Sequence, residues 1–279
     1  MRLEDWAPDP LPDNEALWRT VCPGEPIGVD DLRTVLVEGG GSVVAEADGG
    51  GVIAFAQGPG DARHRGNIRL LAVQPENQRQ GHGRSLLETA ENQLRGRGVR
   101  EVRLAGGVPR YLWPGVDVGN TSAQALARAA GYSSNGVEVN MAIPTDFRAE
   151  NPRGVEVRRV GQTDSATVRD LIEVQWPIWL TEFDIALRRG AVFAAWLDGW
   201  AIGFFAHSAM RSGWIGPMGT HPDFRARGVG AALLAAVCAD LQRSGTSTAV
   251  IAWVGPVDYF VDRGAVVTRS FTKFVKYLG

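Results

Sequence analysis

The sequence predicts an α/β protein of the α+β type, in which two domains of similar fold follow one another along the chain. A pattern of proline, glycine and leucine in residues 75–98 returns in residues 222–245, at a constant offset of 147 residues. A hairpin pattern precedes each copy. The chain has 279 residues, enough for two domains of ordinary size. A repeat of this length is too long for a solenoid and indicates a tandem duplication.

Each copy of the repeat predicts a strand, a glycine loop and an amphipathic helix. The strand-like runs are 67–73 and 214–220. After the loop, leucines recur at helical spacing and a glycine follows the last of them, as expected of a helix with one buried face. The matching residues are Pro75, Gln78, Gly81, Gly83, Leu86, Leu87, Leu94 and Gly98 in the first copy, and Pro222, Arg225, Gly228, Gly230, Leu233, Leu234, Leu241 and Gly245 in the second.

A hairpin is predicted ahead of each loop, because two apolar runs flank an Asp-Gly turn. The runs and turns are 42–47, Asp48-Gly49 and 51–56 in the first half, and 191–196, Asp198-Gly199 and 201–205 in the second. The same reading makes the run 191–206 a hairpin rather than a membrane span, since Asp198-Gly199 interrupts it.

The boundary between the domains is predicted in a polar stretch bounded by Pro144 and Pro152. This gives an N-terminal domain of residues 1–145 and a C-terminal domain of residues 153–279. The second domain is expected to open with a strand at 155–158 and a helix at 166–174.

The glycine loops have the chemistry of a phosphate site. Glycine at the start of a helix lets the backbone approach a ligand closely, and the free N–H groups there favour an anion. Arg79, Arg84, Arg225 and Arg227 add positive charge nearby. No Gly-Lys-Ser/Thr follows, which excludes a Walker loop, and the third glycine and the acidic residue of a dinucleotide fingerprint are missing. Tight strand-to-helix turns without a ligand are the structural alternative.

The order of strand, (Gln/Arg)-x-x-Gly-x-Gly loop and leucine-striped helix, present twice, resembles motif A of the GCN5-related N-acetyltransferases. The resemblance implies a mixed, mostly antiparallel sheet flanked by helices in each domain. It also implies that the loop holds the pyrophosphate of acetyl-CoA and that the preceding strand pairs with the pantetheine arm and supplies a backbone N–H for the oxyanion. By match, the cofactor-binding residues are Leu71, Ala72, Val73, Gln78, Arg79, Gln80, Gly81, His82, Gly83 and Arg84 in the first half, and Met218, Gly219, Thr220, Arg225, Ala226, Arg227, Gly228, Val229, Gly230 and Ala231 in the second.

The resemblance also implies a tyrosine that protonates the leaving thiolate, four residues before a glycine. Counting back from Gly264 places Phe260 there, and Ala127 takes that place in the first half. Tyr259 stands beside Phe260, so Tyr259 and Asp258 are the predicted catalytic residues. Protonation by water and a packing role for Tyr259 stay open. Other candidates for the base that accepts the amine proton are Glu76, His82, Asp117, His207, His221 and Asp223.

Two further kinds of segment have the composition of an acceptor pocket. Aromatic residues beside Pro-Gly or Gly-Pro turns occur in 110–117 and 253–258 and would make rigid walls. Carboxylates among tryptophans would suit a cationic amine, although the tryptophans could equally join the two domains. These residues are Glu173, Trp176, Trp179, Glu182 and Asp184.

Composition narrows the partners. The net charge is −2, from 29 Lys and Arg against 31 Asp and Glu, and favours neither nucleic acid nor an anionic membrane. Only Cys22 and Cys238 are present, which argues against a disulfide framework and suits a cytoplasmic protein. The N-terminus lacks an apolar signal region. No metal site is expected, and the chain is expected to be a monomer or a homodimer.

Together, the resemblance implies an N-acetyltransferase with acetyl-CoA as co-substrate. The acceptor would be the primary amine of a small molecule, such as an amino sugar or an amine metabolite, attacking directly in a ternary complex. The second half is favoured as catalytic, because Arg225 and Tyr259 lie there. The alternative is an acyl-CoA-binding or degenerate tandem module without catalysis, which the missing tyrosines would explain.

Overall fold

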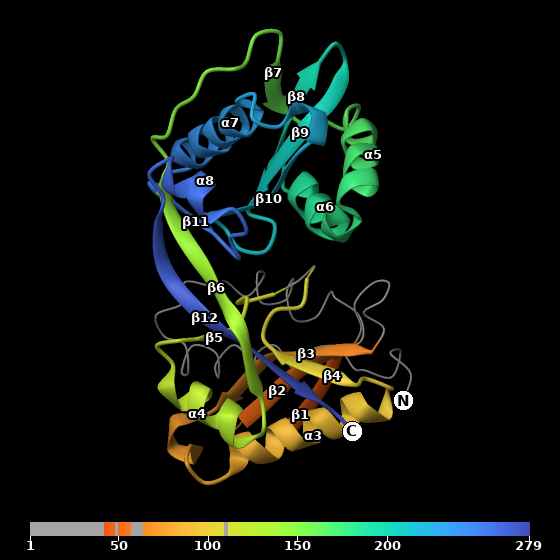
Figure 1. The fold of residues 1–279 in the computed structure, drawn as a ribbon, viewed down its shortest axis with the longest axis vertical. Coiled ribbons are helices and arrows are strands. Elements are labelled where there is room, and N and C mark those ends of the chain that lie inside the picture. The colour runs from red at the N-terminus through yellow and green to blue at the C-terminus, as the bar shows by residue number, and fades with distance from the viewer. Residues whose placement is uncertain (1–41, 48–49, 57–63, 109–110) are drawn as a thin grey trace. The chain divides into compact units, whose positions relative to one another are not determined.

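The computed structural model describes residues 42–47, 50–56, 64–108 and 111–279. The chain forms two compact units (Figure 1). Unit 1 contains residues 1–138 together with Ser270–Gly279, and unit 2 contains Val139–Arg269. Each unit has a mixed sheet with mostly antiparallel pairs and flanking helices, so the predicted fold class is confirmed. Cys22, the Asp48-Gly49 turn and Arg110 lie outside the described residues.

In unit 1 the sheet has the order β1-β2-β3-β4-β12. Only β3 and β4 are parallel; β1–β2, β2–β3 and β4–β12 are antiparallel. The elements are β1 (Ser42–Ala47), β2 (Gly50–Ala56), β3 (Arg65–Val73), α3 (His82–Gly96), β4 (Glu101–Leu104), β5 (Val116–Asp117), α4 (Thr121–Ala129), the first part of β6 (Ser133–Pro144) and the last part of β12 (Val266–Tyr277).

Unit 2 repeats this plan with the order β6-β11-β10-β9-β8-β7, in which β10 and β11 are the parallel pair. Helix α7 covers one face of the sheet, and α5 and α6 cover the other (Figure 1). The elements are β7 (Glu156–Arg159), α5 (Ser165–Gln175), the 3-10 turn η4 (Pro177–Trp179), α6 (Leu180–Arg188), β8 (Val192–Leu197), β9 (Trp200–His207), β10 (Trp214–Thr220), α7 (Val229–Arg243), β11 (Thr248–Ile251) and α8 (Val257–Val261).

The leucine stripes explain why the two repeat helices form. Leu86, Leu87 and Leu94 of α3 are at most 2 % exposed, and the matching leucines of α7 are at most 3 % exposed. Each such side chain contributes roughly 2 kcal/mol by leaving water. Both helices end before a glycine with positive φ, Gly98 at 83° and Gly245 at 84°, as the sequence predicts. No helix among the described residues has the length and apolar character needed to cross a membrane.

The halves of the chain exchange their last strands. In β12, Phe274–Tyr277 pair with Leu104–Glu101 of β4 in unit 1, although β12 is the last strand of the second half. In β6, Met141–Pro144 pair with Ile251–Thr248 of β11 in unit 2. The units therefore differ from the division into 1–145 and 153–279, which leaves each strand in the half that encodes it. The polar stretch after Pro144 marks a linker, but strand pairing is not a local property of the sequence.

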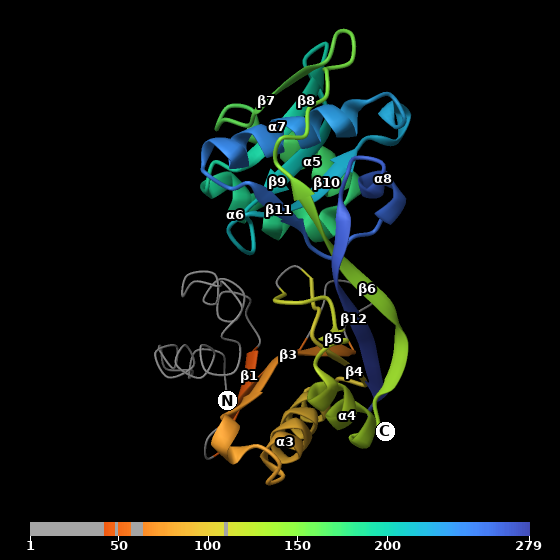
Figure 2. The same ribbon diagram turned by 90° about the vertical axis from the view of Figure 1, so that its left-hand side faces the viewer.

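Polar contacts hold the exchanged end of β12 in unit 1. Lys276 Nζ lies 2.5 Å from Glu91 Oε2 of α3, and Lys273 Nζ lies 2.6 Å from Glu138 Oε1 of β6. Gln124 Nε2 of α4 donates a hydrogen bond to Thr272 Oγ1 at 3.1 Å. Accordingly, β6 and β12 run side by side in both views (Figure 2). These bonds join residues up to 185 positions apart and tie the C-terminal strand to α3 and α4.

The exchange predicts that a substitution near the C-terminus destabilises unit 1. Phe274 is 1 % exposed in the core of unit 1, beside Leu86 and Leu94. We expect Phe274→Ala to lower the free energy of unfolding of unit 1 by about 3–5 kcal/mol, because it leaves a cavity. Hydrogen exchange should show lost protection in α3 and β4 with α7 and β10 unaffected. Tyr277→Ala, at a 72 % exposed position on the same strand, is the control. Equal loss in both units would contradict the assignment.

Candidate functional site

The two glycine loops have the same backbone conformation. Gly81 (φ 93°) and Gly228 (φ 82°) are the N-caps of α3 and α7, and neither helix has a side-chain cap. Two residues earlier, Arg79 (φ 64°) and Ala226 (φ 58°) also have positive φ. Alternating signs of φ turn successive N–H groups toward one side, which makes an anion-binding concavity. The repeat is therefore present in the backbone conformation as well as in the sequence.

The first residue of each loop braces the strand before it. Gln78 Nε2 donates to the carbonyl of Val73 at 3.0 Å, and Arg225 Nε donates to the carbonyl of Thr220 at 3.3 Å. Val73 and Thr220 are the last residues of β3 and β10. A glutamine or an arginine can make this bond, which accounts for both residue types at the first motif position.

Beyond their shared start, the parallel strands part to form a fork in each unit. The pairing of β3 with β4 ends at Ile68 and Leu104, and that of β10 with β11 ends at Ile215 and Ile251, again at the offset of 147 residues. After the fork, Met218–Thr220 pair with β9 alone among the described strands. The other backbone edge of β10 there can pair with an extended ligand as an added strand does. The register of β10 against β9 shifts between Ile215 and Met218, as at a β-bulge.

The residue that follows the fork differs between the units. In unit 1 it is Arg69, which is 2 % exposed and donates through Nη2 to the carbonyl of Gly107 at 3.1 Å. Asn67 Nδ2 likewise donates to the carbonyl of Ala105 at 2.8 Å. Both side chains therefore bridge β3 and the chain that continues from β4. In unit 2 the matching residue is Gly216, and apart from its chain neighbours no heavy atom of the described residues lies within 4 Å of the place its Cβ would take. The fork is bridged in unit 1 and open in unit 2.

Tyr259 lies against the start of α7. A Cβ built on Gly230 would be 2.8 Å from Tyr259 Oη and 3.4 Å from Met218 Cε. The Tyr259 hydroxyl, the start of α7 and the end of β10 therefore meet at this glycine. The hydroxyl oxygen is buried and has no hydrogen-bond partner among the described residues. Burial raises the pKa of Tyr259, against the opposing effect of Arg263, whose guanidinium lies 3.7 Å from the ring centroid. The phenol therefore keeps its proton at neutral pH.

Tyr259 and Phe260 differ in their surroundings, although Phe260 is the residue four positions before Gly264. Phe260 is 2 % exposed and belongs to the core of unit 2. In unit 1, Leu126 Cδ2 would be 3.4 Å from a Cβ on Gly83, so Leu126 takes the place of Tyr259. Ala127 is fully buried, as Phe260 nearly is. Unit 1 therefore has an apolar side chain where unit 2 has a phenol.

Comparison with protein-family models confirms the resemblance to the GCN5-related N-acetyltransferases. The model of the acetyltransferase (GNAT) family matches residues 3–132 and 164–259. The chain belongs to the GNAT family. A search of curated proteins by sequence found no match.

Solved structures support the GNAT fold over nearly the whole chain. A GNAT protein from Sphaerobacter thermophilus has a TM-score of 0.71 at 20 % identity, covering 97 % of this chain and 94 % of that one. A tandem GNAT protein of the clavulanic acid biosynthesis pathway has a TM-score of 0.72 at 15 % identity, with 96 % and 95 % covered. The GCN5-related glucosamine N-acetyltransferase region of a fungal β-N-acetylglucosaminidase has a TM-score of 0.80 at 19 % identity. It matches 99 % of this chain, which spans only 37 % of that protein.

The other candidate bases of this GNAT protein are not gathered at either fork. Asp258 is exposed at the start of α8, and Glu76 and Asp223 are exposed beside the loops. His221 accepts a hydrogen bond from the N–H of Asp223, and Asp117 accepts one from the N–H of Gly119. His82 is the first residue of α3.

The residues of unit 2 that were predicted to line the acceptor pocket include two tryptophans near β10. A Cβ on Gly219 would lie 2.5 Å from the ring of Trp176, so that ring packs directly on the backbone of β10. Trp176 stacks on Trp179 with ring centroids 5.7 Å apart, and Phe204 of β9 lies 5.8 Å from Trp176. Of the carboxylates, Glu173 is exposed, Asp184 pairs with Arg169, and Glu182 is buried.

The walls predicted from Pro-Gly and Gly-Pro turns belong to separate units. In unit 1, Tyr111 and Leu112 are buried and Trp113 is partly exposed. In unit 2, the backbone N–H of Trp253 donates to Asn140 Oδ1 at 2.9 Å. This bond fixes the chain just after β11, on the far arm of the open fork.

Sequence reasoning missed the difference between the forks. Because the offset is constant, Arg69 and Gly216 hold equivalent positions, so the sequence shows that one copy has a long cationic side chain where the other has none. The glycine pattern predicts both strands, but it carries no information on whether a side chain bridges the fork.

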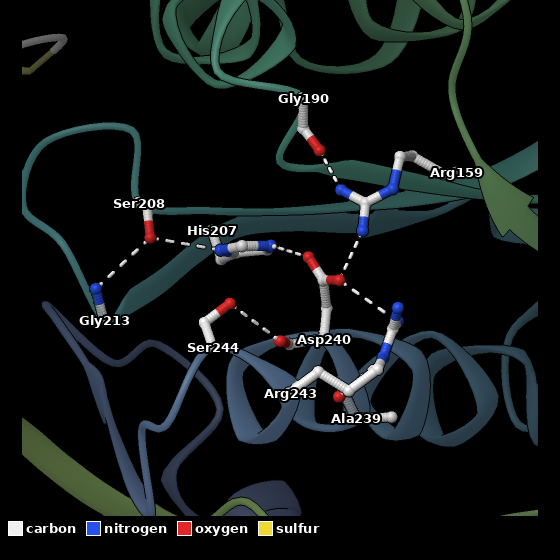
Figure 3. A network of polar contacts seen from close by, with 9 residues as sticks. All are labelled: Arg159, Gly190, His207, Ser208, Gly213, Ala239, Asp240, Arg243 and Ser244. Atoms are coloured by element: carbon white, nitrogen blue, oxygen red, sulfur yellow. Dashed lines mark hydrogen bonds and ion pairs between the residues drawn. The ribbon is translucent and has the colours of Figure 1, made fainter.

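His207 belongs to a polar network at the other end of β10 (Figure 3). It pairs with Ile215 at the start of β10, whereas the glycine loop follows Thr220 at the end. Its Nε2 lies 3.0 Å from Asp240 Oδ2 of α7, and its Nδ1 lies 3.1 Å from Ser208 Oγ. Asp240 Oδ1 also pairs with Arg159 of β7. The network joins β7, β9 and α7, and His207 is a structural residue rather than the base at the fork.

Burial opposes protonation of His207. Burial lowers the pKa of His207, and the neighbouring Asp240 only partly offsets this. Burial also acts to raise the pKa of Asp240, but the hydrogen bonds from Arg159 and His207 bring it below its ordinary value. Neutral His207 can donate from Nε2 to Asp240 and accept from the Ser208 hydroxyl at Nδ1, which satisfies both ring nitrogens.

A folded-state pKa below the unfolded value means that the unfolded chain binds more protons at His207. We therefore expect stability to fall as the pH drops below about 6.5, by about 1.4 kcal/mol for each pKa unit of the shift. His207→Gln should weaken this dependence, because glutamine does not titrate. Denaturation of both proteins at pH 5.5 and 7.5 measures it, and groups that do not contact His207 cancel in the comparison. His221→Gln is the control, and an unchanged dependence in His207→Gln would contradict the assignment.

Proposed function

We propose that this protein is an acetyl-CoA-dependent N-acetyltransferase in which unit 2 carries out the transfer. The acceptor is the primary amine of a small molecule, which attacks the thioester directly in a ternary complex. The proposal rests on the open fork between β10 and β11 and on the buried Tyr259 hydroxyl, which lies at the start of α7. Membership of the GNAT family supplies the reaction class.

The residues of unit 2 fit acetyl-CoA. The N–H groups at the start of α7 suit its pyrophosphate, and Arg225 and Arg227 add positive charge beside them. Gly230 leaves no room for a side chain, since a Cβ there would meet Tyr259. The unpaired edge at Met218–Thr220 suits the amide groups of the pantetheine arm, which can pair with it as a strand does.

The reaction needs three things from the protein. As the amine nitrogen bonds to the thioester carbon, the carbonyl oxygen takes negative charge, and a backbone N–H of the Met218–Thr220 segment stabilises it. The C–S bond then breaks, and Tyr259 Oη donates its proton to the leaving thiolate, since its raised pKa keeps it protonated until then. The amine gives up its own proton to water or to a nearby base.

In unit 1 two observations favour a non-catalytic role. Arg69 and Asn67 bridge the fork, and Leu126 occupies the place of the phenol. The loop at Gly81 nevertheless has the conformation of its partner at Gly228. We propose that unit 1 binds no acyl thioester productively and that its loop holds at most the phosphates of a coenzyme.

The names of similar proteins suggest which acceptors to test. One similar region is a glucosamine N-acetyltransferase, and another similar protein acts in clavulanic acid biosynthesis. We propose small amines, amino sugars included, as acceptors of this protein, without nucleic acid or a membrane as partner and with a monomer or homodimer as the working form. The free, buried Cys238 is consistent with a cytoplasmic location.

The two loops should respond differently to blockage. We expect acetyl-CoA turnover with a panel of primary amines, glucosamine among them, to be abolished by Gly228→Trp and retained by Gly81→Trp. Tryptophan fills the phosphate concavity in both, but only unit 2 has an open fork. Calorimetry with acetyl-CoA reports whether each loop binds, and circular dichroism reports whether each variant is folded. Turnover that is lost only in Gly81→Trp would assign catalysis to unit 1.

The phenol of Tyr259 should affect the chemical step and not binding. We expect Tyr259→Phe to lower kcat by about 10²–10⁴-fold, the usual contribution of a positioned acid. The affinity for acetyl-CoA should stay the same, because the ring still packs on Phe260 and Arg263. Tyr277→Phe, at an exposed tyrosine, is the matched control. An unchanged kcat in Tyr259→Phe would mean that water protonates the thiolate.

A further inference from the structure

An indole ring lies on the part of β10 that the proposed reaction uses. A Cβ built on Gly219 would be 2.5 Å from Cη2 and from Cζ3 of Trp176, whereas carbon atoms in contact lie about 3.5–4.0 Å apart. Gly219 is the middle residue of Met218–Thr220, the segment beyond the fork. The ring therefore occupies the space that a side chain at residue 219 would take, and a ligand bound to this backbone lies beside it.

The two sides of β10 are distinct at this point. Successive residues of a strand face opposite sides of the sheet. Met218 faces α7, since its Cε would be 3.4 Å from a Cβ on Gly230, the second residue of that helix. Gly219 faces the other side, where Trp176 follows the last residue of α5. The indole ring therefore covers the strand on the side of α5 and α6.

Aromatic neighbours hold the Trp176 ring in place. Its centroid lies 5.7 Å from that of Trp179, which stacks on it, and 5.8 Å from that of Phe204. Phe204 is the residue of β9 that pairs with Gly219, and it is fully buried. Phe183 of α6 in turn meets Phe204 edge to face at 6.4 Å. Trp176 remains partly exposed, so it is a fixed wall with some of its surface open to a ligand.

The proposed reaction directs the acyl group toward this wall. The thioester sulfur must lie within reach of Tyr259 Oη, which is at Gly230 on the α7 side of β10. The carbonyl oxygen must lie about 3 Å from a backbone N–H of Met218–Thr220, at the edge of the strand. Sulfur and the alkyl carbon are bonded on opposite sides of the carbonyl carbon. The alkyl group therefore points away from the phenol, toward the side that Trp176 covers.

We infer that Trp176 limits the size of the acyl group, so that unit 2 transfers acetyl and rejects longer acyl chains. The inference rests on the proposed function and deepens it, because it names the residue that selects the acyl donor. A closely packed ring has little room to move, and an added methylene would have to displace it. Gly219 gives its space to the ring and leaves none for a longer chain.

Steady-state kinetics of the full chain with acetyl-, propionyl- and butyryl-CoA test this assignment. The acceptor is the amine of the panel that the unaltered protein acetylates fastest. For the unaltered protein we expect kcat/KM to fall by about tenfold or more with each added methylene. Trp176→Ala should bring the three donors within about threefold of one another, by raising the values for the longer chains. Trp176→Phe keeps more of the packing and should admit propionyl-CoA ahead of butyryl-CoA.

Another tryptophan of unit 2 provides the matched control. Trp200, the first residue of β9, is 74 % exposed, and Trp200→Ala should leave the preference among the three donors unchanged. Two results overturn the inference: equal use of the three donors by the unaltered protein, and a preference for acetyl-CoA that is as strong in Trp176→Ala as in the unaltered protein. Circular dichroism shows whether each variant is folded.

Failure of the inference and failure of the proposed function give different results. If no donor is used with any amine, the proposed function fails. Calorimetry with acetyl-CoA and butyryl-CoA then still decides on Trp176. A weaker affinity for butyryl-CoA that Trp176→Ala removes supports the inference. An equal ratio of the two affinities in both proteins overturns it, and binding of neither donor overturns both proposals.

A methyl group on Gly219 tests the contact without substrate. Gly219→Ala brings a Cβ into the ring of Trp176, so we expect it to lower the Tm of the unaltered protein. In the Trp176→Ala background the same change should lower the Tm much less, a coupling that a double-mutant cycle measures. Gly255→Ala is the control, since apart from chain neighbours no heavy atom of the described residues lies within 4 Å of its Cβ position. Equal losses in both backgrounds would overturn the inference, because the ring would not then cover Gly219.

Discussion

The parting of one parallel strand pair is the constraint on which the site depends. In unit 2 the hydrogen bonds between β10 and β11 stop after Ile215 and Ile251, and everything the proposed reaction uses lies beyond this point. A sheet that continued to pair would satisfy the backbone groups of Met218–Thr220 internally, leaving none for a ligand. The glycine loop follows the segment that the parting leaves unpaired on one edge, and the phenol of Tyr259 and the ring of Trp176 lie close to it. The backbone geometry of β10 therefore determines where the side chains of the proposed site can act.

Duplication preserved the geometry and changed the chemistry. Both forks open at equivalent positions, both loops use two residues of positive φ, and both first motif residues brace the end of the strand. Backbone conformations of this kind are set by glycines and by pairing, which the two halves share. The side chains that fill each fork are under no such constraint. Arg69 stands where unit 2 has Gly216, whose φ of 125° favours glycine, and Leu126 stands where unit 2 has Tyr259. Each substitution alters what the fork can bind while leaving the fold intact.

The sequence predicted what local patterns determine. The leucine stripes of α3 and α7, the bounds of β10 and the hairpin turn at Asp198-Gly199, where both residues have positive φ, all follow from spacing and turn chemistry. Two features depended on distant contacts and could not be predicted from local patterns. The pairing of β12 with β4 joins residues about 170 positions apart. The choice between Tyr259 and Phe260 depends on the rotation of α8 against the core.

The exchanged strands make each fork depend on both halves of the chain. One arm of the open fork is β11, and its other edge is held by Met141–Pro144 of β6, which the first half encodes. One arm of the bridged fork is β4, and its other edge is held by Phe274–Tyr277 of β12. A short parallel strand with one edge unpaired is poorly stabilised, because parallel pairing alone leaves half of its backbone groups to water. Unit 1 can therefore lose its phenol and close its fork without becoming dispensable. The half that encodes it still supplies the strand that fixes β11, and with it the position at which β10 and β11 part.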